Sequence, residues 1–184
     1  MFELFYPYEY VESVFLIDYN KLYSKGYRGI IFDIDNTLVA HGKGSTKEID
    51  ELFRDIHAAG LKTLLLSNNG EERIKRFLEN IDSLYISNAK KPSTANYLKA
   101  IEMMDIKRKE ALFIGDQIFT DIFGANRSAI DSILVRYIRA ANETKIGIRR
   151  NMEKMILKFY GRNKAYQNRI GDIHIKELLK NAVE

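Results

Sequence analysis

The apolar positions of the chain fall into short runs that alternate with longer amphipathic segments. Five of the runs are four to six residues long and rich in leucine, isoleucine and valine, which is typical of strands buried inside a sheet. The predicted strands are residues 30–34, 61–66, 83–86, 111–114 and 132–135. Each run is bounded by polar or glycine-containing turns, so the strands are short and separate.

Between these runs, apolar residues recur every three or four positions, as in helices with one buried face. In the clearest case, Ser45-Thr46-Lys47-Glu48 fits a capping box, apolar residues follow at helical spacing, and Gly60 ends the segment. The predicted helices cover residues 45–59, 71–79, 92–104, 119–128 and 144–160.

Strands that alternate with helices indicate an α/β fold, here a Rossmann-like, three-layer α/β/α arrangement around a parallel sheet. We expect residues 1–184 to form a single domain, with a core over about 28–136 and a basic helical extension over about 140–165. The first 28 residues are rich in tyrosine and phenylalanine and do not fit the alternation. They are either a cover for the core or an anchor at a membrane interface.

The composition of the chain indicates the cellular compartment in which the protein works. The chain has no cysteine, which excludes disulfides and thiolate metal sites and favours a reducing cytosol. The opening MFELFYPYEY has no basic segment of the secretory type, and no apolar run approaches the roughly 18 residues of a membrane span. We therefore expect a cytoplasmic protein, with peripheral contact at the inner membrane face as the open alternative.

The net charge of +4 hides a strongly basic region. Residues 136–169 contain ten lysines and arginines but only two acidic residues, which suggests an anionic partner. The helix predicted at 144–160 also has an apolar stripe, formed by Ile148, Met152, Met155, Ile156 and Phe159. We favour packing of this stripe on the sheet over contact with an anionic phospholipid surface, and a merely solvated basic face is the simplest alternative.

Polar side chains follow the strands at the edge where open α/β sheets bind ligands. These are Asp33, Asp35, Asn36 and Thr37 after the first strand, Ser67, Asn68 and Asn69 after the second, Lys90 and Lys91 after the third, and Asp116, Gln117 and Asp121 after the fourth. The carboxylates would repel one another unless a cation lay between them. An all-oxygen set suits Mg²⁺, and neighbouring hydroxyl, amide and backbone N–H groups suit phosphate oxygens. Together these groups point to phosphoryl transfer, in which a carboxylate can act as nucleophile and a second one as acid and base.

The same residues resemble the motifs of a known family. Asp33-Ile34-Asp35-Asn36-Thr37 resembles the DxDxT signature of the haloacid dehalogenase (HAD) superfamily, and Ser67 resembles its second motif. Lys91 before Pro92 resembles the third motif, and Gly115–Asp121 resembles the fourth. Within the superfamily, FDIDNTLV, LLSNN, AKKP and GDQIFTDIFGANR resemble the YqeG-type branch of capless subfamily IIIA, which is related to phosphatidylglycerophosphate phosphatases.

The resemblance implies a Mg²⁺-dependent, two-step phosphatase and assigns roles within it. Asp33 would be the nucleophile and a metal ligand, and Asp35 the acid and base, with its backbone carbonyl on the metal. Asp116 would be the second carboxylate ligand. Thr37, Ser67, Asn68 and Lys91 would hold the phosphate, with Lys91 also counted as catalytic and preferred to Lys90. Asp121 would orient Lys91 or sit in the outer shell of the metal. No role is assigned to His41 or Gln117.

The spacing of the motifs leaves no room for a cap domain over the site. Only 29 residues separate Thr37 from Ser67, and 22 separate Asn68 from Lys91. An open site suits a bulky substrate, and phosphatidylglycerophosphate is our leading expectation. The alternatives are a phosphatase of a soluble nucleotide, sugar phosphate or phosphoprotein, and a nucleic-acid or ribosome-associated binding module that uses the basic segment. Of these, nucleic-acid binding is the least favoured.

Overall fold

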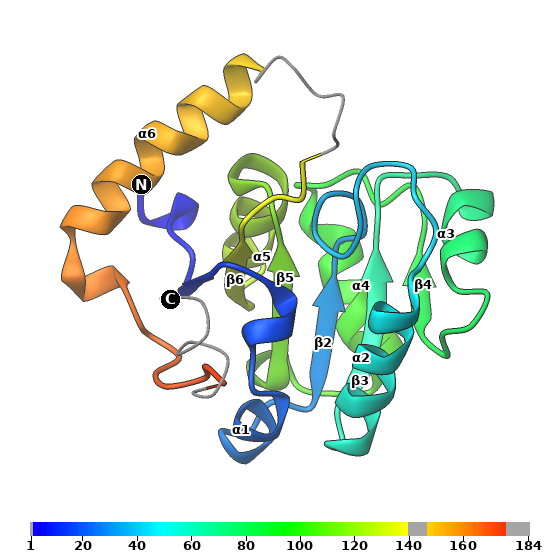
Figure 1. Ribbon diagram of the computed structural model, residues 1–184. Helices are drawn as coiled ribbons and strands as arrows, with labels where there is room; N and C mark the ends of the chain where they lie inside the picture. Colours follow the sequence, from blue (N-terminus) through cyan, green and yellow to red (C-terminus); the bar gives the residue numbers. More distant parts are fainter. Residues whose placement is uncertain (1, 140–146, 176–184) are drawn as a thin grey trace, which may run out of the picture.

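The computed structural model describes residues 2–139 and 147–175, and a six-stranded parallel sheet lies at its centre (Figure 1). The strand order is β1-β6-β5-β2-β3-β4. The strands are β1 (Glu9–Val11), β2 (Gly29–Phe32), β3 (Lys62–Leu66), β4 (Leu84–Ile86), β5 (Ala111–Gly115) and β6 (Asp131–Val135). The predicted α/β fold class is therefore confirmed, with one more strand than the five expected.

Helices cover both faces of the sheet, which gives the predicted three layers (Figure 1). Side chains of β2 alternate between the faces, so Ile30 and Phe32 join one apolar cluster and Ile31 the other. The first face is covered by α1 (Tyr19–Ser24), α2 (Lys47–Ala58) and α3 (Glu71–Phe77). The second face is covered by α4 (Thr94–Met104) and α5 (Phe123–Arg127).

The aromatic N-terminal segment covers part of the core. The ring of Phe5 stacks on Phe123 with 4.6 Å between ring centroids and meets Phe119 edge-on. Tyr10 lies in β1 and pairs with Leu134 of β6. A strand of only three residues within a run of aromatic residues has too short a pattern to be predicted, which is why β1 was missed.

Two local predictions were wrong at helix beginnings. Thr46, not Ser45, caps α2, because its hydroxyl accepts the Ile49 N–H at 3.4 Å while Ser45 donates to Asp50. The helix expected over 119–128 is interrupted, since Ile118–Ile122 forms a π-helical turn before α5 begins.

The basic C-terminal helix α6 (Ile148–Arg162) turns the unexpected face inward. Residues 144–146 of the predicted helix lie outside the described residues. Glu153 and Tyr160 are buried, whereas the side chains expected to pack on the sheet are largely exposed. The prediction that the whole apolar stripe packs on the sheet is therefore wrong. Of its members, only Ile156 is partly buried. Among the described helices, none has the length and apolar character needed to cross a bilayer.

Candidate active site

The candidate site lies where the three central strands end. Phe32 of β2 is in register with Leu65 of β3 and Ile114 of β5, so the residues that follow these strands meet at one edge. The Asp33 N–H donates to the Ile114 carbonyl at 3.0 Å and continues the pairing by one residue. Asp33 thus takes the central position, between Ser67 and Asp116.

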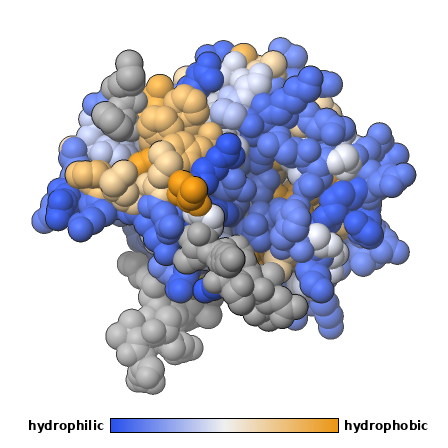
Figure 2. Space-filling model, turned by 90° about the horizontal axis from the view of Figure 1, so that it is seen from above, coloured by the Kyte–Doolittle hydropathy of each residue, from blue (hydrophilic) through white to orange (hydrophobic). Residues whose placement is uncertain are grey.

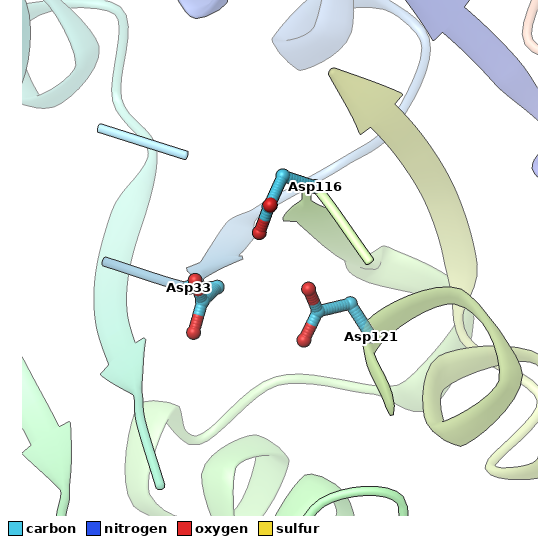
Figure 3. Close-up of side chains that lie close together, drawn as sticks. All are labelled: Asp33, Asp116 and Asp121. Atoms are coloured by element: carbon cyan, nitrogen blue, oxygen red, sulfur yellow. The ribbon is translucent and has the colours of Figure 1, made fainter. Parts of the chain in front are cut away.

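Three buried carboxyl groups converge on one space at this edge (Figure 3). Asp33, Asp116 and Asp121 each offer an oxygen, and these oxygens all lie within 4.8 Å of one another. The close approach of Asp121 requires glycine at position 115, because a Cβ there would lie 2.6 Å from the Asp121 side chain. The glycine of the fourth motif is thus explained by sterics.

Burial makes this cluster unfavourable in its fully ionised form. It raises the pKa of Asp33 to about 6, although the charge of Lys91 opposes the shift. It also raises the pKa of Asp116 to about 8, and repulsion by Asp121 and Asp33 adds to the effect. The carboxylates therefore favour a cation in their midst.

Lys91 supplies one of the cations. Its ammonium group lies 2.5 Å from Asp33 Oδ1 and 2.7 Å from Asp121 Oδ1. Burial alone would lower the pKa of Lys91, but the two carboxylates outweigh it, so the pKa is raised and the lysine stays charged. Lys90 is exposed, so the structure brings Lys91 to the site and leaves Lys90 outside it.

The hydroxyl of Thr37 bridges the two carboxylates on the other side. It lies 3.2 Å from Asp33 Oδ2 and 3.2 Å from Asp116 Oδ1, but it has only one proton to donate. Two buried carboxylate oxygens thus share a single donor, which fits a place for a hard divalent cation with oxygen ligands.

Asp35 lies beside this cluster and has partners of its own. Its carboxylate accepts hydrogen bonds from the Gly42 N–H at 2.9 Å, from Asn69 at 2.5 Å and from Arg73 at 2.9 Å. Burial works to raise the pKa of Asp35, but these donors outweigh it and hold the pKa below its usual value. Asp35 is not a member of the close group formed by Asp33, Asp116 and Asp121, and its partners differ from theirs.

Ser67 and Asn68, both predicted phosphate contacts, have different surroundings. The Ser67 hydroxyl accepts from the backbone N–H of Asn69 at 3.2 Å and from its side chain at 3.0 Å, so its own proton remains for an acceptor. The Asn68 oxygen accepts the Lys91 N–H at 2.8 Å and thereby fixes the loop that carries this lysine.

The structure also gives the surroundings of Gln117, Asn36 and His41, to which the sequence assigned no catalytic role. Gln117 donates its backbone N–H to Asp121 Oδ2 at 3.0 Å, so both Asp121 oxygens have partners. Asn36 adopts a left-handed turn with φ of 65° and accepts the His41 N–H, which makes it a turn former. His41 itself is largely exposed, with its ring nitrogen 3.7 Å from Asp35.

Two arginines at the site were not predicted. Arg73 comes from the first turn of α3, which begins at the same sheet edge as the second motif, so its position in sequence was a usable signal. Arg150 comes from α6, pairs with the Asp116 carboxylate and donates to the Asp116 carbonyl at 2.7 Å. Glu153 holds Arg150 at 3.0 Å and also accepts the Ile118 N–H at 2.8 Å. Nothing in the sequence distinguishes this arginine from its solvated neighbours.

Comparison with known proteins identifies the family. Residues 45–128 match the family described as haloacid dehalogenase-like hydrolase. The chain is 34% identical to "Probable phosphatase YqeG" of Bacillus subtilis (strain 168) over 156 aligned residues. The aligned region covers 84% of this chain and 91% of that protein. The chain belongs to the haloacid dehalogenase-like hydrolases. The predicted HAD membership is thus confirmed, and both matches support the prediction of a phosphatase.

A solved structure shares the α/β architecture of this chain. The crystal structure of an uncharacterized protein from Listeria monocytogenes serotype 4b matches with a TM-score of 0.52 and 18% identity, over 74% of this chain and 99% of that one. At this identity the match supports the fold alone. In this HAD chain the segments 33–46 and 67–93 are described throughout, and neither contains a further domain.

The partners of Asp35 give a first testable prediction. Arg73→Ala removes a hydrogen bond and a positive charge, so the pKa of Asp35 should rise toward its ordinary value. Carbon-13 NMR titration of the Asp35 carboxyl group in metal-free protein measures this directly. Arg73→Lys should preserve part of the effect, and Arg76→Ala, at an exposed position on the same helix, should leave the pKa unchanged. An unchanged pKa in Arg73→Ala would show that Arg73 does not control this carboxyl group.

Proposed function

We propose that the protein is a Mg²⁺-dependent phosphomonoesterase that works through an aspartyl-phosphate intermediate. One observation carries the proposal. Asp33 is buried at the end of the central strand, paired with Lys91 and facing a second carboxylate, Asp116. A nucleophilic carboxylate beside a fixed cation and a metal site is what phosphoryl transfer requires.

In the first step, one oxygen of Asp33 attacks the phosphorus atom of the substrate. The ester P–O bond breaks, and Asp35, in the minor fraction of the protein in which it is protonated, gives its proton to the departing alkoxide. In the second step, water attacks the phosphorus of the aspartyl-phosphate and Asp35 takes the proton of that water. The bond between phosphorus and the Asp33 oxygen breaks, which releases inorganic phosphate and restores the free carboxylate.

The oxygen ligands at the site are consistent with Mg²⁺. Asp33, Asp116 and the backbone carbonyl of Asp35 would hold the ion, and all are oxygen ligands of the kind it prefers. When bound, Mg²⁺ would neutralise charge on the non-bridging phosphate oxygens. Asp121 takes a supporting role in this proposal, because Lys91 and the Gln117 N–H each occupy one of its oxygens. Asp33 and Asp116, in contrast, share the single proton of Thr37, which leaves an oxygen for a cation.

The remaining groups divide into those that hold the phosphate and those that orient them. Ser67 has a hydroxyl proton to offer, and Lys91 has a third N–H beyond those directed at Asp33 and Asp121. Thr37 lies between the two carboxylates that flank the phosphate position. The side-chain oxygen of Asn68 accepts the backbone N–H of Lys91, and its amide N–H groups remain for substrate.

For the substrate, we propose phosphatidylglycerophosphate. The observation in favour is the open site, since the loops that could carry a cap are short and are fully described. An uncovered mouth admits a phosphate ester whose remaining part is too large to be enclosed. Soluble nucleotides, sugar phosphates and phosphoproteins are the competing substrates.

The nucleophile is tested by a single substitution. Asp33→Asn should lower the kcat for para-nitrophenyl phosphate in Mg²⁺ by about 10³-fold or more, because the neutral amide cannot form the intermediate. Asp55→Asn, at an exposed position on α2, should turn over substrate as the wild type does. Circular dichroism checks that both variants fold. Full Mg²⁺-dependent activity in Asp33→Asn would contradict the proposal.

The substrate is tested by competition among phosphate esters. Phosphatidylglycerophosphate in mixed vesicles should be hydrolysed with a kcat/KM at least about tenfold above that for any soluble ester, because in this proposal the open mouth serves a phosphate held at a bilayer surface. Phosphate release is measured for the lipid, nucleoside monophosphates, sugar phosphates and a phosphopeptide. Preference for a soluble ester would overturn the substrate assignment but leave the phosphatase intact.

A further inference from the structure

The outer face of α6 is apolar and exposed. Ile148 is 82% exposed, Met155 55%, Phe159 53% and Met152 46%. At about 100° per residue these four side chains fall within an arc of about 60°, so they form one stripe along the helix. Four large apolar side chains left in water on one helix are a cost unless a partner covers them.

The stripe has basic borders. Lys158 and Arg162 flank it on one side and Arg149 on the other, and all three are exposed. The one acidic residue of the helix, Glu153, is buried and paired with Arg150. An apolar stripe with cationic side chains on both sides is the pattern of a helix that lies in the surface of an anionic bilayer.

The inner face fixes the orientation of this stripe relative to the site. Arg150 binds Asp116, and Glu153 accepts the Ile118 N–H, so α6 is tied to the edge where the carboxylates meet. Leu157 packs beside them against the apolar side chains of the π-helical turn. The outer face of α6 therefore has a defined place beside the mouth of the site.

An open groove connects the stripe with the site. It has a volume of about 390 Å³, and its lining residues include Lys91 of the site and Arg149 and Met152 of α6. Seen from above, an apolar patch lies on the side of the molecule that carries α6, next to a hydrophilic surface (Figure 2). A surface that contacts the stripe thus meets the mouth of the site at the same time.

We propose that the outer face of α6 docks on an anionic lipid bilayer and brings the open site to the level of the headgroups. The purpose of this docking rests on the proposed function, but the binding itself does not require catalysis. A second copy of the chain is less suited to the stripe, because a symmetric contact would bring the two sets of basic borders together. Nucleic acid would pair with the arginines and lysines and leave the stripe in water.

Vesicle sedimentation tests the docking. The wild type should sediment with vesicles of phosphatidylcholine and phosphatidylglycerol, bind weakly to phosphatidylcholine alone, and bind less as salt increases. The double variant Met155→Glu/Phe159→Glu should lose about tenfold or more of its partition into anionic vesicles. A matched control, Leu84→Glu/Met103→Glu, replaces two side chains that are 40% and 39% exposed on β4 and α4, and it should bind as the wild type does.

A second variant and an activity assay separate the outcomes. Lys158→Glu/Arg162→Glu should also weaken binding to anionic vesicles, and all variants should hydrolyse para-nitrophenyl phosphate at the wild-type rate. A wild type that stays in the supernatant, or a stripe variant that binds as well as the control, overturns the docking. So does light scattering that shows a wild-type dimer and a monomeric stripe variant. If the wild type does not hydrolyse para-nitrophenyl phosphate, that result counts against the proposed function and not against the docking.

Discussion

Buried carboxylates cannot remain ionised side by side unless cations share the space with them, and this constraint organises the molecule around the site. Asp33, Asp35, Asp116 and Asp121 lie together at one edge of the sheet. Three cationic side chains meet them: Lys91 pairs with Asp33 and Asp121, Arg73 with Asp35, and Arg150 with Asp116. Glu153 is buried as well and shares Arg150 with Asp116, so five carboxylates face three cationic side chains. The negative charge exceeds the positive charge by two, and a divalent cation would balance it.

The three cationic side chains come from separate parts of the chain, so their ion pairs with the aspartates also hold these parts together. Lys91 follows β4, Arg73 belongs to α3 and Arg150 to α6. The parallel sheet makes this possible, because its strands all end at the same edge and the helices that follow begin there. Even the C-terminal helix, which has few apolar contacts with the sheet, is held by its polar inner face. That polar attachment leaves the apolar face of α6 outside.

Much of the site could be predicted from the sequence, because its main residues directly follow strands. Asp33, Ser67 and Asp116 were found from short apolar runs and their endings. The loop after the third run offered both Lys90 and Lys91, and the family resemblance decided for Lys91. The close approach of Asp121 to Asp33 and Asp116 was less evident, since it depends on the bend of a π-helical turn and on the space that Gly115 leaves.

What could not be predicted depends on distant partners. Periodicity shows that α6 has two faces, but the inward face is decided by the pairing of Arg150 with Asp116, across 34 positions of sequence. The usual rule that the apolar face packs inward therefore failed for this helix. In the same way, β1 exists because it can pair with β6, and its three residues contain no pattern of their own.

The central claim is that Asp33 carries the phosphoryl group, and trapping the intermediate tests it most directly. The protein is mixed with Mg²⁺ and para-nitrophenyl phosphate, quenched in acid within the first turnovers, digested and examined by mass spectrometry. The account predicts a phosphorylated peptide that contains Asp33, with fragment ions that place the group on this residue and a modification that hydroxylamine removes. Steady hydrolysis with phosphate on another residue, or on none, would contradict it.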